Sequence, residues 1–203
     1  MWYSLRFQFR WLVVLLILQG CTKMPVSSEL HFWISSAPYS ADPQEFDSFI
    51  HHITFRSVEL PLLTQYRPGE FTGLLADNWQ ASPDFRRWTF HIRHGLQFEN
   101  GDPITAETVA LSWRRLAFLQ KKNHSFSGFL DELKGFNSIT SPTTVFEGLT
   151  AAGDTLDLQF RDPQPKILNT IGFGLYSVVH PADFDPVTGA WKDPRKVIAS
   201  GPY

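Results

Sequence analysis

The segment LADNWQASPDFRRWTFHIRHGLQFENGDPITAETVALSWRRLAFLQ, residues 75–120, decides the fold of this chain. Trp88, Phe90 and Ile92 alternate with other residues, which predicts a strand over residues 88–93 with these three side chains turned inward. Asn100-Gly101 predicts a tight turn after this strand. Residues 105–120 predict a helix, because apolar side chains recur there at helical spacing. That apolar stripe consists of Ala106, Val109, Ala110, Trp113, Leu116 and Ala117.

Shorter patterns on either side predict further elements. Residues 44–66 have a mainly helical pattern that Pro61 interrupts. Gly153-Asp154 separates residues 149–152 from residues 156–160 and predicts a hairpin. The other expected elements are strands over residues 30–35 and 175–179 and a loop over residues 36–43, in which Asp42 is a candidate helix cap. The expected fold class is therefore α/β, with a mixed α+β layout.

The composition is that of an ordinary globular protein. The 203 residues are 43% apolar and 19% charged, which excludes a chain that is disordered throughout. Lys plus Arg number 18 and Asp plus Glu number 20, for a net charge of −2. Since no excess of positive charge is available to bind a phosphate backbone, nucleic acid is not an expected partner. The single cysteine, Cys21, excludes an internal disulfide.

The first twenty residues have the pattern of a targeting segment. Arg6 and Arg10 are the only charged residues before Cys21, and the apolar run from residue 11 to residue 18 is long enough for a signal peptide but too short to span a membrane. Leu18-Gln-Gly-Cys21 resembles the bacterial lipobox. We therefore expect a lipoprotein signal peptide over residues 1–20, lipidation of Cys21, and a spacer over residues 21–29. The alternative is a short buried helix whose cysteine is an apolar side chain.

A search for reactive constellations favours a protein without enzymatic activity. The sequence contains no Gly-x-Ser-x-Gly elbow and no P-loop, and Cys21 is assigned to lipidation. His91 and His94 are close in sequence, but odd spacing within a strand predicts that they face opposite sides of the sheet. No catalytic residue, metal site or cofactor is therefore expected.

A set of short motifs supports a resemblance to a known family. It resembles the signature of the family 5 extracellular solute-binding proteins, the receptors of peptide, oligopeptide and nickel importers of the ABC type. The Ser112-Trp-Arg-Arg115 ending is most similar to the oligopeptide branch. The motifs are Leu75–Trp79, Ser82–Asp84, Trp88–Arg93, Gly95, Phe98, Asn100-Gly101, Pro103–Glu107, Val109 and Ser112–Arg115, with Asp42-Pro43, Leu156–Pro163 and Ser200–Tyr203 further out.

The resemblance implies a type II periplasmic-binding-protein-like fold, of which this sequence covers part. Residues 30–203 correspond to the N-terminal part of the solute-binding domain, an incomplete first lobe. The second lobe and the C-terminal return of the chain are expected to be absent. An incomplete lobe predicts unpaired strand edges and exposed apolar surface, because Trp88, Phe90 and Trp113 belong to a larger core, and residues 22–203 are then expected to bind a hydrophobic dye and to self-associate.

The implied function is that of the substrate-binding lipoprotein component of a peptide ABC importer, present as an N-terminal fragment. Its partners are then a peptide ligand, the permease subunits if the complete protein exists, and the membrane of a bacterial cell envelope, with the chain facing the periplasm or exterior. The identity of the ligand, peptide or nickel or another solute, stays open. The alternative is a non-transporting lipoprotein from a truncated gene, with a surface-interaction role or no binding activity.

The resemblance also implies ligand-facing residues. In oligopeptide receptors the loop after the first strand pairs with the peptide backbone, and here that loop contains Ser35, Ser36, Ala37 and Pro38. Pro38 has no N–H to donate. Phe126 corresponds to an aromatic side chain that approaches the ligand, and the alternative is that Phe126 or Phe129 belongs to the apolar core.

Two local departures from the family pattern are visible. Thr108 stands where an acidic residue commonly closes a capping box with Thr105, which predicts one reciprocal hydrogen bond fewer at the start of the helix. Phe85 follows Asp84 where the family usually has glycine.

Overall fold

The computed structural model describes residues 40–45, 54–56, 58–123 and 128–201. The chain divides into two units, residues 1–34 and residues 35–203, and every described residue belongs to the second. The expected signal peptide, Cys21, the strand over residues 30–35 and the loop residues up to position 39 therefore lie outside the described residues.

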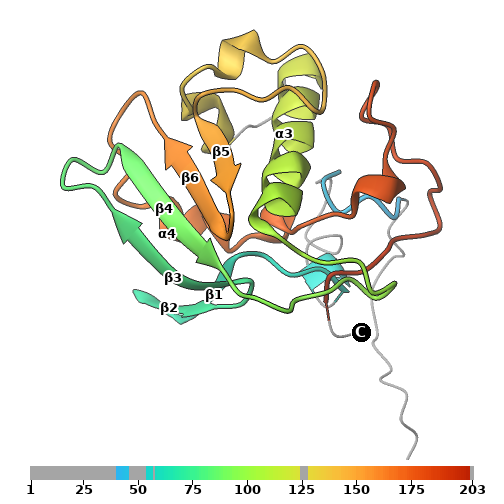
Figure 1. The fold of residues 1–203 in the computed structure, drawn as a ribbon, viewed down its shortest axis with the longest axis horizontal. Coiled ribbons are helices and arrows are strands. Elements are labelled where there is room, and N and C mark those ends of the chain that lie inside the picture. Colours follow the sequence, from blue (N-terminus) through green and yellow to red (C-terminus); the bar gives the residue numbers. More distant parts are fainter. Residues whose placement is uncertain (1–39, 46–53, 57, 124–127, 202–203) are drawn as a thin grey trace, which may run out of the picture. The chain divides into compact units, whose positions relative to one another are not determined.

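A four-stranded antiparallel sheet forms the centre of the described unit (Figure 1). Its strands are β3 (Ala76–Ala81), β4 (Arg87–Ile92), β6 (Thr155–Gln159) and β5 (Leu149–Ala152), in that order across the sheet. The predicted strand over residues 88–93 is confirmed, and its alternating side chains Trp88, Phe90 and Ile92 are buried. The predicted hairpin is confirmed as β5 and β6, which turn at Gly153 with φ = +58°.

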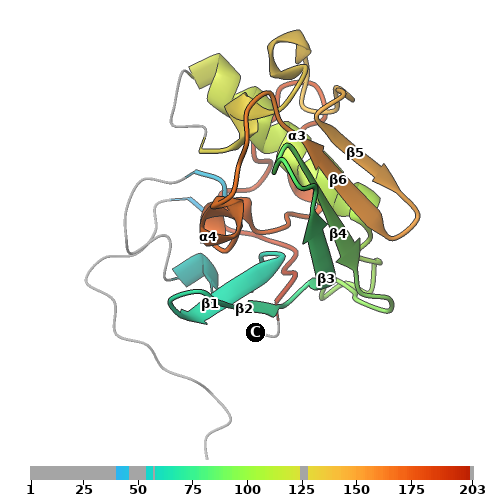
Figure 2. The same ribbon diagram turned by 90° about the vertical axis from the view of Figure 1, so that its left-hand side faces the viewer.

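Helix α3 (Ala106–Asn123) packs against β5 and β6 (Figures 1 and 2). All six residues of the predicted apolar stripe are buried. The prediction of a missing hydrogen bond at the start of this helix is wrong. Thr105 Oγ1 accepts from the Thr108 backbone N–H at 3.2 Å, and Thr108 Oγ1 accepts from the Thr105 N–H at 2.7 Å. The Thr108 hydroxyl therefore completes the capping box that an acidic side chain commonly completes in this position, because both groups supply an oxygen acceptor.

A second, two-stranded sheet precedes the first in the chain. It pairs β1 (Leu63–Arg67) with β2 (Glu70–Gly73) through a turn at Gly69, whose φ is +81°. The prediction of mainly helical structure over residues 44–66 is therefore wrong from residue 63 onward. Among the described residues between 44 and 66, only residues 54–56 and 58 are helical. After Pro61, the carbonyl of Leu62 accepts from the N–H groups of Leu74 and Ala76, which holds the chain extended.

The remaining elements are short. The predicted strand over residues 175–179 is wrong, because residues 175 and 176 belong to a 3₁₀ turn (η3, Gly174–Tyr176). The extended residues that follow donate to loop and side-chain oxygens, Val178 N–H to the Leu60 carbonyl and Val179 N–H to Ser112 Oγ. The other short elements are η1 (Leu130–Glu132), η2 (Phe136–Ser138), α4 (Ile167–Ile171) and η4 (Pro181–Asp183).

The core lies between α3 and the larger sheet and is closed by aromatic side chains. Trp113 packs edge-on against Phe129 at 5.3 Å between ring centroids, and Phe129 lies 4.7 Å from Tyr176. The three aromatic residues assigned to a larger core, Trp88, Phe90 and Trp113, are buried within the described unit, with exposed fractions of 5%, 0% and 0%. The large apolar side chains that are exposed among the described residues are Tyr66, Phe85, Val145, Phe173 and Val187.

Within the described part of the chain, no helix has both the length and the apolar character needed to cross a membrane.

Candidate functional site

The described residues that follow the predicted ligand loop in the sequence belong to a buried polar cluster. Ser35, Ser36, Ala37, Pro38 and Phe126 fall outside the described residues. The chain becomes described at residue 40, and helix α3 ends at residue 123, three residues before Phe126. The described residues 40–44 therefore show how the far end of the predicted ligand loop is attached.

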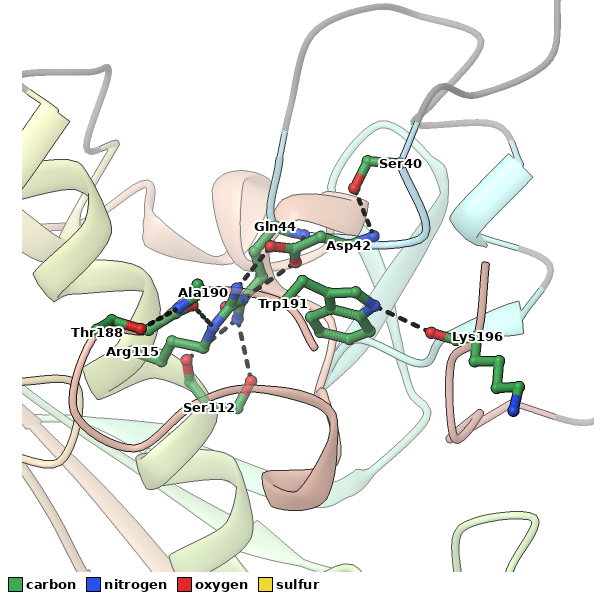
Figure 3. A network of polar contacts seen from close by, with 10 residues as sticks. Ser40, Asp42, Gln44, Ser112, Arg115, Thr188, Ala190, Trp191 and Lys196 are labelled. Carbon is green, nitrogen blue, oxygen red and sulfur yellow. Dashed lines mark hydrogen bonds and ion pairs between the residues drawn. The ribbon is translucent and has the colours of Figure 1, made fainter. Parts of the chain in front are cut away.

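Arg115 of α3 anchors this segment through a buried ion pair (Figure 3). Its guanidinium donates to both carboxylate oxygens of Asp42, at 3.0 Å and 2.5 Å, which is the bidentate geometry that arginine forms with a carboxylate. The two side chains are only 1% and 2% exposed. The same guanidinium donates to Gln44 Oε1 at 2.7 Å and to the Gly189 carbonyl at 2.9 Å. One arginine thus joins a loop, a helix and a second loop.

Gln44 and Ser112 extend the cluster along the helix. The Gln44 amide donates to the backbone carbonyl and to the hydroxyl of Ser112, both at 3.1 Å. Ser112 Oγ also accepts from the Val179 N–H at 3.1 Å. Asp42 Oδ1 accepts from the Gln44 N–H at 3.0 Å, so the carboxylate shapes the local turn as well as pairing with Arg115. The start of the described chain is therefore tied to α3 and to the segment that follows η3.

Two aromatic rings enclose the guanidinium. The Arg115 Cζ atom lies 5.1 Å from the ring centroid of Phe184 and 5.3 Å from that of Trp191, within the range of cation–π attraction. Trp191 is itself held by a hydrogen bond from its indole nitrogen to the Lys196 carbonyl at 2.9 Å (Figure 3). The cluster is thus a buried structural anchor whose polar groups face one another, and it ties residues 42 and 44 to helix α3.

A second group of polar side chains contradicts a prediction made from the sequence. His91 and His94 do not face opposite sides, because β4 ends at Ile92 and the chain turns at residues 94 and 95. Their rings lie 5.9 Å apart between centroids. His94 Nε2 lies 3.2 Å from Asp154 Oδ2, and His91 Nδ1 lies 2.8 Å from Asp77 Oδ1. Strand alternation failed here because it applies only as far as the strand extends.

Comparison with known protein families finds a match over the part of the chain that contains the larger sheet and helix α3. The family profile described as bacterial extracellular solute-binding proteins, family 5 Middle, matches residues 70–203. The chain belongs to this family. Its fold is of the type II periplasmic-binding-protein kind, of which it covers only part.

Two curated relatives give the scale of the match. The periplasmic murein peptide-binding protein MppA of Escherichia coli strain K12 is 28% identical over 188 residues, which are 90% of this chain and 34% of that protein. The periplasmic oligopeptide-binding protein OppA of Haemophilus influenzae is 35% identical over 82 residues, which are 37% of this chain and 15% of that protein. This family member therefore spans about a third or less of the length of these relatives.

Solved structures resemble the described unit to a similar extent. A periplasmic oligopeptide-binding protein from Borrelia burgdorferi matches with a TM-score of 0.69 and 25% identity, over 83% of this chain and 35% of that one. The unliganded open form of the murein tripeptide-binding protein MppA matches with a TM-score of 0.63 and 26% identity, over 74% and 30%.

Proposed function

We propose that this chain supplies part of the peptide-binding domain of a substrate-binding lipoprotein that serves an ABC importer. Membership of the solute-binding family supports the proposal, together with the names of relatives that bind oligopeptides and murein peptides. The ligand is taken up without chemical change, so the chain is not an enzyme. The relatives are about three times as long, and we propose that a second lobe outside these 203 residues completes the cleft.

The Asp42–Arg115 anchor is the observation that carries the proposal. A peptide that adds to a loop like an extra strand needs that loop to be fixed in advance, because ordering it on binding would weaken affinity. Residues 40–44 are held to α3 by buried charge-assisted hydrogen bonds. The proposed ligand residues Ser35, Ser36, Ala37 and Pro38 lead directly into this segment, and Phe126 follows the end of the same helix.

Peptide titration tests this function. Without the second lobe, water competes for each backbone hydrogen bond, whose net value is about 0.5–1.5 kcal/mol. We therefore expect the 203-residue chain to bind a pool of short peptides no more tightly than roughly millimolar, as followed by calorimetry or NMR. Saturable micromolar binding by the monomer would show instead that these residues form a complete receptor.

The DNA that follows the Tyr203 codon separates the two candidate functions. A downstream frame that encodes a second lobe supports the receptor, and the longer protein should then bind peptides at micromolar concentration or tighter. If no such frame exists, or if the longer protein binds no peptide, the alternative of a non-transporting lipoprotein replaces the proposal.

The lipid anchor and the location in the bacterial cell envelope are tested at Cys21. We propose that cleavage precedes Cys21 and that acyl chains on its sulfur and amino group hold the protein at the membrane, since more than one chain is needed for durable anchoring. Cys21→Ala should abolish incorporation of labelled fatty acid and remove the protein from the acylated fraction. Labelling that survives the substitution would rule out the lipobox.

A further inference from the structure

His91, His94 and Asp154 place three metal-ligating groups together on the surface of the larger sheet. One ligand atom from each residue lies within 4.8 Å of the other two. His94 Nε2 and Asp154 Oδ2 are already 3.2 Å apart. In a tetrahedral zinc site with bonds of about 2.0–2.1 Å, neighbouring ligand atoms are separated by about 3.4 Å. The His94–Asp154 edge therefore has the required length, and the half-buried His91 ring must move closer.

The backbone holds these three residues in place. Asp154 lies in the β5–β6 turn, where its carbonyl accepts from the Ile92 N–H at 2.8 Å and so joins the turn to the end of β4. His91 lies on β4 opposite Thr155, the residue after Asp154. His94 follows the end of β4 and precedes Gly95, whose φ of +75° reverses the chain. The ligands thus come from rigid strand ends and tight turns.

Asp77 supplies the outer partner that metal-bound histidines commonly have. The β3–β4 register shifts between Ala76 and Asn78, which makes Asp77 the extra residue of a β-bulge. Bulges redirect side chains, and here the Asp77 carboxylate lies 2.8 Å from His91 Nδ1. A hydrogen bond from Nδ1 to a carboxylate fixes the imidazole tautomer and leaves Nε2 as the ligand atom.

We propose that His91, His94 and Asp154 form a binding site for a divalent first-row transition metal ion, with Zn²⁺ as its representative. Two imidazoles and a carboxylate are ligands that suit such ions. The two carboxylates of Asp77 and Asp154 balance the charge of the cation, and the neighbouring Arg93 guanidinium is directed to the Gly73 carbonyl at 3.1 Å. A hollow of about 140 Å³, whose lining includes His94, Asp154, Arg93 and Thr105, borders two of the three proposed ligands.

Calorimetric titration of the purified chain with ZnCl₂ tests the site. The expected result is a high-affinity event of one ion per chain, accompanied by shifts of the His91 and His94 imidazole signals in NMR spectra. His94→Gln and Asp154→Asn should each weaken this event at least tenfold. Asp77→Asn should weaken it about tenfold through loss of the outer hydrogen bond.

Two controls keep the result interpretable. Asp162→Asn removes an exposed carboxylate that pairs with Arg86 outside the cluster and should leave zinc affinity unchanged. Zinc should raise the melting temperature of the native chain and of Asp162→Asn but not that of His94→Gln, whose melting temperature without zinc should equal that of the native chain. Absence of binding, or an affinity that His94→Gln or Asp154→Asn leaves unchanged, would overturn the site.

Discussion

Arg115 is a buried cation on helix α3 whose hydrogen-bond partners Asp42, Gln44 and Gly189 come from two separate loops. Removing one member of such a pair leaves the other charged and unpaired in an apolar environment, which costs about 3–5 kcal/mol. We therefore expect Arg115→Met to lower the free energy of unfolding by about this amount, measured by urea denaturation. Methionine keeps much of the side-chain volume, so the loss reports mainly the uncompensated Asp42 carboxylate.

Two further variants identify the cause of that loss. Asp42→Asn combined with Arg115→Met should be less destabilising than Arg115→Met alone, because the double variant buries no unpaired charge. Arg195→Met is the surface control, since the Arg195 side chain is 89% exposed and should contribute less than about 0.5 kcal/mol. If the double variant is no more stable than the single one, the ion pair is not the source of the effect.

Phe85 is the one non-glycine residue with positive φ in the described part of the chain, at +53°. The left-handed conformation costs a residue with a Cβ atom about 1–2 kcal/mol and costs glycine little, which explains why glycine is usual at this turn. Phe85→Gly and Phe85→Ala both remove the ring that lies 6.2 Å from Trp88. Their difference isolates the backbone, and we expect the glycine variant to be more stable by about 1 kcal/mol in urea denaturation. Equal stability, or a more stable alanine variant, would refute this assignment of strain.

At the residue scale, the sequence indicated single residues better than pairs of residues. It marked Phe85, Thr108 and Cys21 because each occupies a position in a local pattern. It did not indicate the pairing of Asp42 with Arg115, which are 73 residues apart and meet only after α3 has packed. The signal available in the sequence was Arg115 itself, which lies beside the predicted apolar stripe of α3, because a buried arginine requires an anionic partner.

The start of α3 is held by two threonines rather than by a threonine and a carboxylate. Thr108→Val keeps the shape of the side chain but removes the acceptor for the Thr105 N–H, and it should lower the free energy of unfolding by about 0.5–1 kcal/mol. Thr108→Glu restores a carboxylate acceptor and should stay within about 0.5 kcal/mol of the native chain. Thermal unfolding followed by circular dichroism measures both variants, and a Thr108→Val variant as stable as the native chain would contradict the cap.

At the scale of elements, the sequence correctly predicted the helices and strands in which apolar residues repeat at regular spacing over several residues. Strand β4, helix α3 and the β5–β6 hairpin were found because burial on one face imposes a regular spacing. Residues 63–66 and 175–179 were assigned wrongly. Short apolar runs show that a segment is buried but not which backbone groups it meets, and the N–H groups of Val178 and Val179 bond to a loop and to a serine.

At the scale of the whole described unit, distant parts of the chain meet at Glu59 and Ser200. The Glu59 carboxylate accepts from the Ser200 N–H at 3.2 Å and from its hydroxyl, and the Gly201 N–H donates to the Val58 carbonyl at 2.8 Å. A Cβ atom on Gly201 would lie 2.5 Å from that carbonyl oxygen, so glycine permits the approach. This contact joins the segment before β1 to residues 200 and 201, which were noted in the sequence only as a family motif.

Glu59 makes the stability of this junction dependent on pH. Burial raises the pKa of Glu59 to about 8, with nearby Asp183 and Glu99 adding to the rise, whereas hydrogen bonds from Ser200 oppose it. Between its ordinary pKa of 4.5 and about 8, the folded chain holds a proton that the unfolded chain has released. The free energy of unfolding therefore falls as pH rises through this range, by up to about 1.4 kcal/mol per pH unit from this group.

Glu59→Gln should remove that dependence while keeping an oxygen acceptor for Ser200. We expect the native chain to approach the stability of the variant near pH 5 and to fall below it by a few kcal/mol at pH 9, in urea denaturation at a series of pH values. Glu147→Gln replaces an exposed carboxylate and should follow the native chain at every pH. If the native chain and Glu59→Gln lose stability in parallel between pH 5 and pH 9, then Glu59 is ionised in the folded chain at neutral pH and the junction does not hold a proton.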